Sequence, residues 1–133
     1  MRLLLDSHVF VWTKAEPAHL SQEARAAIID PDNDVFVSIA SPWELWIKHA
    51  KKPIPGFGSV LDSASGFAAA MRESRIALLD ITLDHVAAAI ALAAIHRDSF
   101  DRMIIAQAII EKLTIVTADP VFEKYKVCRV LPA

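Results

Sequence analysis

Acidic residues beside short apolar runs are the side chains of this sequence best suited to chemistry. Asp6 ends a run of leucines, Asp119 lies just past another apolar run, and Glu44 and Asp101 each lie in the first turn of a predicted helix. Carboxylate oxygens suit hard divalent cations such as Mg²⁺ and Mn²⁺ rather than zinc. If the acids meet, their mutual repulsion requires shared protons or bound cations. Bound cations would in turn support attack of water on a phosphate.

Each acid also has an ordinary structural explanation, as a helix cap or a turn residue. The stretch from Ser41 to Glu44 matches the S-x-x-E capping box, and Asp98 is placed to cap the helix that carries Asp101. Helix dipoles favour acids in first turns in any case. The residues alone leave both explanations open, and the positions of the acids in the fold must distinguish them.

Short apolar runs alternate along the chain with helical patterns, which predicts an α/β fold with a mainly parallel sheet covered on both faces. We expect one domain over residues 1–133, arranged as a three-layer α/β/α sandwich. The predicted strands are 2–6, 34–40, 76–82, 113–119 and 128–132. The predicted helices are 19–30, 43–52, 61–74 (interrupted by Gly66), 83–96 and 99–112. In such sheets ligands bind outside the carboxyl ends of the strands, where these acids lie.

The helical periodicity predicts the direction in which the Asp101 side chain points. At about 100° per residue it shares one face with Ile104, Ile105 and Ala108, whereas Gln107 falls on a different side. We therefore expect Asp101 to point inward. An ionised carboxylate in that position costs several kcal/mol unless a partner compensates it, and either helix-terminal N–H groups or a metal ion would do so.

Composition limits the partners only weakly. The net charge of −2 shows no basic stripe of the kind that nucleic-acid-binding proteins usually carry, and the basic residues Lys48, Lys51 and Lys52 form only a local cluster. The longest apolar runs are too short to span a membrane. The lone Cys128 excludes an internal disulfide and suits a reducing compartment, so a cytoplasmic location is expected.

Four ordered motifs across the chain resemble those of PIN-domain proteins, and more narrowly those of VapC-type ribonuclease toxins of type II toxin–antitoxin systems. The motifs are LLLDSHVFVW, VSIASPWELWIK, HRDSFDRMIIAQA and LTIVTADPVFEKY. The resemblance implies a PIN-like fold and an Mg²⁺- or Mn²⁺-dependent endoribonuclease. It also implies a VapB-like antitoxin as partner and commonly a homodimer.

The resemblance assigns the same residues as metal ligands and as catalytic groups: Asp6, Glu44, Asp101 and Asp119. Thr117 matches a hydroxyl residue that supports such sites, and Asp98 is expected to cap a helix or support the ligands. The sequence departs from the subgroup at Ser99, where proline is usual, and at Ser7, where threonine is common. Neither departure removes a ligand.

Other polar residues near these motifs have less definite roles. Lys48, Arg97 and Arg102 are candidates for contact with the RNA backbone, or for pairing with the outer carboxylates. His8 and His96 are close enough in sequence to acids for a mixed site to be conceivable, although hydrogen-bonded histidines near helix starts are the commoner case. The tryptophans are expected in the core or at an interface, where an exposed one could dock the antitoxin: Trp12, Trp43 and Trp46.

Two other functions compete with a nuclease. An aspartate-based phosphohydrolase or a phosphate receiver also places an aspartate after the first strand, but the former wants a second aspartate where His8 stands and the latter wants a preceding acid pair. The second alternative is a non-catalytic PIN-like binding module that uses the acids as caps. The presence of four acids favours the metal-dependent nuclease over both.

Overall fold

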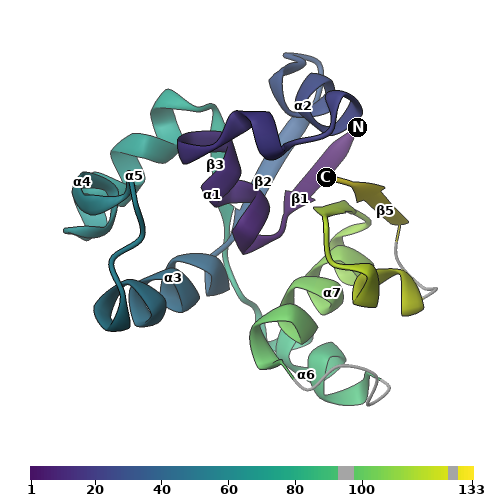
Figure 1. Cartoon of the computed structure of the whole chain (residues 1–133). Coiled ribbons are helices and arrows are strands. Elements are labelled where there is room, and N and C mark those ends of the chain that lie inside the picture. The colour runs from purple at the N-terminus through teal and green to yellow at the C-terminus, as the bar shows by residue number, and fades with distance from the viewer. Residues whose placement is uncertain (93–97, 126–128) are drawn as a thin grey trace.

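The centre of the fold is a five-stranded parallel sheet (Figure 1). The computed structural model describes residues 1–92, 98–125 and 129–133. The strand order is β3-β2-β1-β4-β5, and every pair of neighbours runs parallel. The strands are β1 (Arg2–Leu5), β2 (Asp34–Ser38), β3 (Ile76–Leu79), β4 (Thr114–Thr117) and β5 (Arg129–Pro132). The predicted parallel sheet is confirmed, with strands shorter than the predicted ranges. Cys128, the first residue of the last predicted strand, lies outside the described residues.

Burial of β1 on both faces explains why its sequence is continuously apolar. Leu3, Leu4 and Leu5 are all inaccessible to solvent. Leu3 and Leu5 belong to one hydrophobic cluster and Leu4 to another, because successive side chains of a strand point to opposite faces. A strand that packs on both sides has no position for a polar residue until it leaves the sheet.

Helices cover both faces and give the predicted three layers. The face of the sheet that carries Leu3 and Leu5 packs against five helices. These are α1 (Ser7–Ala15), α2 (Gln22–Ile29), α3 (Ala40–Lys51), α4 (Gly58–Leu61) and α5 (Ala64–Glu73). The Leu4 face packs against α7 (Ser99–Glu111) and the short 3₁₀ helix η2 (Pro120–Lys124), with α6 (Leu83–Ala91) packed on α7. A second 3₁₀ helix, η1 (Pro17–His19), joins α1 to α2.

The structure differs from the sequence prediction at several helices. Helix α1 was not predicted, and it begins directly after Asp6. Gly66 does not interrupt its helix; it lies in the first turn of α5, where its N–H donates to the capping Ser63 hydroxyl at 3.0 Å. A Cβ at Gly66 would lie 2.5 Å from the carbonyl oxygen of Ser59, so this position has no room for a side chain. The glycine therefore reflects the close approach of α4 to α5.

The order of the strands defines one crevice at the carboxyl edge of the sheet. The chain moves outward from β1 to β2 and β3, and then returns to the other side of β1 with β4. The connections therefore leave β1 and β4 toward opposite faces, which opens a crevice between their carboxyl ends. Asp6 follows one of these strands and Thr117 ends the other. Within the described residues, none of the helices combines the length and apolar character that crossing a bilayer requires.

Candidate active site

Asp6 lies at the centre of the crevice. Its backbone N–H continues the sheet by donating to Val116 O at 3.0 Å, and its side chain is 4% exposed. The Thr117 hydroxyl donates to Asp6 Oδ2 at 2.8 Å. Asp6 occupies the N-cap position of α1, but its side chain makes no capping hydrogen bond there. Capping, the structural alternative for this residue, therefore does not account for its carboxylate.

The ionised form of Asp6 is poorly compensated. Burial raises the pKa of this carboxyl above its ordinary value of 3.8, and the nearby charge of Glu44 raises it further. The Thr117 hydrogen bond, the charge of His8 and the Ser7 amide lower the pKa, but they do not offset the burial. Among the described residues no Lys, Arg or His forms an ion pair with Asp6. A buried acid of this kind is a common feature of functional sites.

Glu44 lies beside Asp6 on the first turns of α3. It is 6% exposed, and its Oε2 is 3.2 Å from the ammonium of Lys48, one helical turn further on. A buried hydrogen bond of 2.9 Å from the Ser7 hydroxyl to the Ser41 hydroxyl connects the segments that carry the two acids. The carboxylate of Glu44 is close enough for its charge to raise the pKa of Asp6, and its role as a metal ligand stays a prediction.

The predicted capping box at the start of α3 is wrong. The helix begins at Ala40, and no side chain caps it at Ile39. The Ser38 hydroxyl instead accepts the Ala40 N–H at 3.1 Å, while the Ser41 hydroxyl accepts from Ser7. Ser41 is therefore already inside the helix, and neither it nor Glu44 is available to cap it.

Thr117 links Asp6 to the fourth predicted acid. Its hydroxyl donates to Asp6 and accepts the backbone N–H of Asp119 at 3.0 Å. Asp119 is exposed, and its Oδ1 accepts the Val121 N–H at 2.9 Å at the start of η2. The cap explanation thus holds for Asp119, which also lies at the rim of the crevice.

The start of α7 brings Asp98 and Asp101 to the same edge. Asp98 is confirmed as the cap of this helix, because its Oδ1 accepts the N–H groups of Phe100 at 2.9 Å and Asp101 at 3.3 Å. Asp101 is half-buried on the first turn. The rings of Phe100 and Trp43 meet edge to face with their centroids 5.0 Å apart. Because Trp43 precedes Glu44 and Phe100 precedes Asp101, this contact holds the first turns of α3 and α7 together.

The four predicted acids thus reach one edge of the sheet without forming a closed set of ligands. Within residues 1–92, 98–125 and 129–133, no three His, Cys, Asp or Glu side chains are grouped closely enough to hold one metal ion. The donor chemistry nevertheless fits a hard divalent cation, because the groups are carboxylates with a supporting hydroxyl. Burial is the main cause of the raised pKa of Asp6, so a bound cation would stabilise the ionised carboxylate at this position. Coordination by all four acids stays a prediction.

The predicted RNA-contact residues differ in their surroundings. Lys48 is about half exposed beside Glu44 and, with Ser7 and His8, lines a shallow hollow of about 120 Å³. Arg102 Nη2 instead donates to Ala89 O at 2.8 Å and Leu92 O at 3.1 Å, at the end of α6. His96 and Arg97 lie outside the described residues, so their predicted roles have no structural description.

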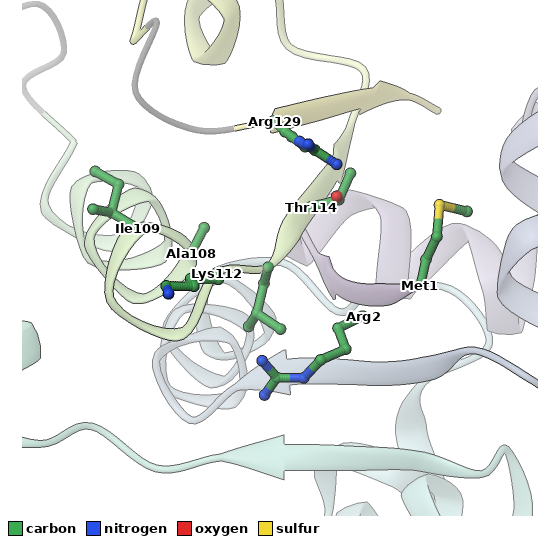
Figure 2. Close-up of a pocket in the computed structure, with 8 residues that line it drawn as sticks. Met1, Arg2, Ala108, Ile109, Lys112, Thr114 and Arg129 are labelled. Atoms are coloured by element: carbon green, nitrogen blue, oxygen red, sulfur yellow. The ribbon is translucent and has the colours of Figure 1, made fainter.

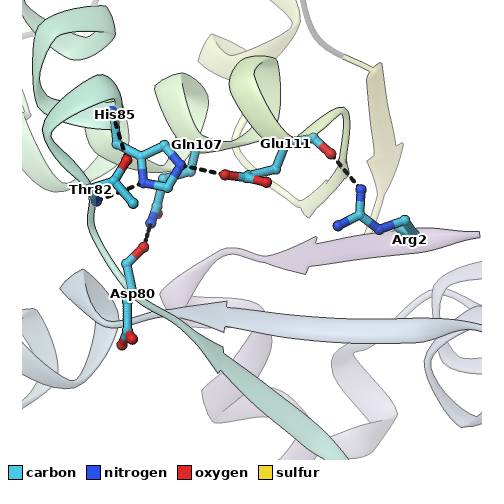
Figure 3. A network of polar contacts seen from close by, with 6 residues as sticks. All are labelled: Arg2, Asp80, Thr82, His85, Gln107 and Glu111. Carbon is cyan, nitrogen blue, oxygen red and sulfur yellow. Dashed lines mark hydrogen bonds and ion pairs between the residues drawn. The ribbon is translucent and has the colours of Figure 1, made fainter.

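A second polar network, which sequence reasoning missed, lies at the other end of α7 (Figure 3). The Thr82 N–H donates to His85 Nδ1 at 3.0 Å, so the ring proton lies on Nε2, which is 2.9 Å from Glu111 Oε1. Arg2 Nη1 donates to the Glu111 carbonyl oxygen at 2.6 Å. His85 is fully buried and completes a capping box with Thr82. The T-x-x-H spacing at 82–85 is the signal that could have identified it.

Gln107 is also buried, contrary to the helical-wheel expectation. It is inaccessible to solvent because α6 packs on that side of α7, and its Nε2 donates to Asp80 O at 3.3 Å (Figure 3). Its Oε1 has no hydrogen-bond partner among the described residues. The helix is therefore buried on more than the one face that the sequence predicts.

Basic side chains gather at one part of the amino edge of the sheet, at the opposite end of the strands from the crevice. A hollow of about 480 Å³ there is lined by Arg2, Lys112 and Arg129, together with Thr114 and apolar residues (Figure 2). Arg2 also lies over the Phe36 ring, 5.7 Å from its centroid. This hollow is thus remote from the acids, which lie where the strands end.

The parallel sheet, its switch of direction at β1 and the acids at that edge define a class of α/β domain with a carboxylate-lined crevice. The chain belongs to the PIN domain family, whose family model matches residues 3–127. No curated protein is similar enough in sequence to count as a match.

Several solved structures share the fold. VapBC2 from Rickettsia felis, bound to a DNA fragment from its promoter, includes a chain that is 16% identical with a TM-score of 0.73, covering 100% of this chain and 99% of that one. VapBC-1 from nontypeable Haemophilus influenzae gives 13% identity and a TM-score of 0.68, with 99% and 98% covered. A toxin–antitoxin complex from Klebsiella pneumoniae gives 18% identity and a TM-score of 0.61, with 97% and 95% covered. At these sequence identities the similarity shows a shared fold and nothing beyond it.

Proposed function

We propose that this protein is a metal-dependent endoribonuclease of the VapC type, the toxin of a toxin–antitoxin pair. The observation that carries the proposal is Asp6: a buried carboxyl with a raised pKa, held by Thr117 and adjacent to Glu44 at the switch point of a PIN-domain sheet. A carboxyl kept there without an ion pair among the described residues suits a cation better than it suits a structural role.

In this proposal Asp6, Glu44, Asp101 and Asp119 hold Mg²⁺ or Mn²⁺. When bound, such an ion polarises a phosphate oxygen and acidifies a water for in-line attack. The protein's own contribution is placement. Thr117 fixes the Asp6 carboxylate, and Asp98 caps the helix that presents Asp101.

The basic side chains near the site are expected to contact the RNA backbone. Lys48 neutralises Glu44 in the free protein. We expect its ammonium to turn toward a phosphate oxygen when RNA binds, because the side chain is half exposed and flexible. Arg97 and Arg102 remain further candidates for such contacts.

The proposed partners are a VapB-like antitoxin and a second copy of the chain. The antitoxin is supported by the fold neighbours, which are components of VapBC and toxin–antitoxin complexes. The homodimer is supported by α6, on which Leu83, Val86 and Ile90 are 84%, 41% and 79% exposed and share one helical face. A cytoplasmic location, where RNA and a reducing environment coincide, completes the proposal.

Cleavage of a mixed RNA pool with and without Mn²⁺ tests the proposed function. We expect Asp6→Asn to lower the rate by more than the ~10- to 100-fold typical of changes that only support a metal ligand. Asp62→Asn is the matched control, because Asp62 is an exposed aspartate outside the crevice. Undiminished Mn²⁺-dependent cleavage by a folded Asp6→Asn protein would refute the proposal. Cleavage by none of the proteins, with no metal-induced thermal shift, would favour a non-catalytic binding module.

A further inference from the structure

Trp43 is the one aromatic side chain among the described residues that is mainly exposed. It is 62% exposed, whereas Phe10 and Phe57 are fully buried. Trp12 and Trp46 are half-buried against the core, as expected from the sequence, and the Trp46 Nε1–H donates to Leu61 O at 2.7 Å. An indole that gains so little from burial contributes little to folding stability. Its position beside Glu44 suggests a different role.

The orientation of this ring is fixed in the free protein. Phe100 meets it edge to face at 5.0 Å between centroids, with an angle of 82° between the ring planes. Both rings belong to residues that directly precede predicted ligands, Glu44 and Asp101. The aromatic pair therefore lies at the mouth of the crevice and presents a flat apolar surface that needs no rearrangement to receive a ligand.

We propose that Trp43 is a stacking platform for an unpaired base of the RNA substrate. The inference rests on the proposed function, since it assumes that a phosphodiester bond of the same RNA reaches the acids. Single-stranded RNA is recognised largely by stacking of splayed bases on aromatic side chains. The ammonium of Lys48, exposed on the same helix, provides the cationic contact that the backbone needs. Paired RNA keeps its bases stacked on one another and cannot use this platform.

A protein partner is the competing occupant of this surface. Ile39 and Ile47 lie one turn on either side of Trp43, but they are only 37% and 40% exposed. The three residues form an apolar row along α3, in which Trp43 is the most exposed member and the one next to Glu44. This distribution, together with the adjoining carboxylates, favours the base.

Binding of a short, unstructured, fluorescently labelled RNA tests the inference in the Asp6→Asn background, which keeps the RNA intact. We expect Trp43→Ala to weaken binding about 5- to 150-fold, the range for loss of one stacked base. Trp43→Phe, which retains an aromatic face, should weaken it less. Ile47→Ala is the matched control on the same helix and should leave the affinity unchanged. RNA should also quench tryptophan emission, and Trp43→Phe should abolish the quenching although Trp12 and Trp46 still emit.

Four outcomes would overturn the inference. If Trp43→Ala and its parent bind the single-stranded RNA with equal affinity, Trp43 does not stack on a base, and the proposed function is unaffected. If Trp43→Ala forms a smaller assembly in solution than its parent and binds RNA equally well, the surface around Trp43 contacts a second copy of the chain. If the Asp6→Asn parent binds no RNA and the wild type cleaves none, both the inference and the proposed function fail. Equally tight binding of duplex RNA would also contradict stacking by an unpaired base.

Discussion

The two ends of helix α7 hold buried polar groups of different character. At the carboxyl end, His85 has partners on both ring nitrogens, the Thr82 N–H and Glu111, and Arg2 bonds the Glu111 carbonyl oxygen. At the amino end, Asp6 is almost as deeply buried but relies mainly on the Thr117 hydroxyl, and burial raises its pKa. His85 has an acidic partner in Glu111, whereas the part of the chain that the structure describes shows no ion pair with Asp6.

This difference separates a polar group that supports the fold from one that belongs to a site. A satisfied network in a low-dielectric interior stabilises the protein and defines its packing. A poorly compensated carboxyl lowers stability until a cation or a proton reaches it. The comparison therefore predicts that the two ends of α7 respond to substitution with opposite signs in stability.

The largest stability effect is expected at the satisfied end. His85→Ala removes a buried side chain, leaves the Thr82 N–H uncapped and deprives Glu111 of its partner. We expect a loss of roughly 2–4 kcal/mol in the free energy of unfolding, measured by urea denaturation. RNA cleavage per folded molecule should persist, because His85 lies at the opposite end of α7 from the acids.

His19→Ala is the matched control, since this chain contains a second His–Glu contact at the surface. His19 Nδ1 is 2.8 Å from Glu16 Oε2, with both side chains more than half exposed. We expect a change of at most about 1 kcal/mol, as is usual for exposed pairs. Equal losses for His19→Ala and His85→Ala would contradict the special role of the buried network.

An intermediate effect of opposite sign is expected at Asp6 in the absence of divalent cations. Because the folded state holds the Asp6 proton more tightly than the unfolded state, wild-type stability falls as pH rises from about 3.8 through the folded pKa. Asparagine does not titrate, so Asp6→Asn should melt at a higher temperature than wild type at neutral pH. The difference should shrink as pH falls toward 3.8.

Thermal unfolding across this pH range, in buffer with a chelator, provides the measurement. Added Mn²⁺ should then raise the melting temperature of the wild type and not that of Asp6→Asn. If Asp6→Asn is less stable than wild type at neutral pH, the carboxylate is compensated in the fold and the comparison fails.

The smallest effect is expected at Gln107, which is buried but only half satisfied. Gln107→Met removes an oxygen without a partner among the described residues and a 3.3 Å hydrogen bond to Asp80, while filling a similar volume. The two contributions oppose each other, so we expect a change of about 1 kcal/mol or less, on the stabilising side. A loss above about 2 kcal/mol in urea denaturation would place Gln107 with the satisfied network.

The sequence predicts the strands, the parallel sheet and the edge at which the acids gather, because apolar runs and the acids that follow them are local patterns. It misjudges details that depend on tertiary contacts. Ser41 matches a capping box, but Ser7, which approaches from a distant segment, engages its hydroxyl. Gln107 is polar by residue type and buried by α6.

The candidate site shows the same division. The places of the four acids after strands and at helix starts predict that they lie at one edge, and the family resemblance adds Thr117 to them. Asp98 is confirmed as a cap. The Trp43–Phe100 contact and the pairing of Lys48 with Glu44 require coordinates, because no periodic pattern brings two separate helices to a given distance. Coordination of a cation by all four acids remains to be measured.

The bond between Thr117 and Asp6 also determines when the crevice can form. The two residues are separated by 111 positions in the chain, and β4 fills its place next to β1 only after β2 and β3 have been synthesised. A nascent chain that ends before β4 has Asp6 at a bare strand edge, without Thr117 or Asp119. Such long-range closure is late in folding because the loop entropy must be overcome first. The crevice therefore assembles only after β4 and Asp119 have been synthesised.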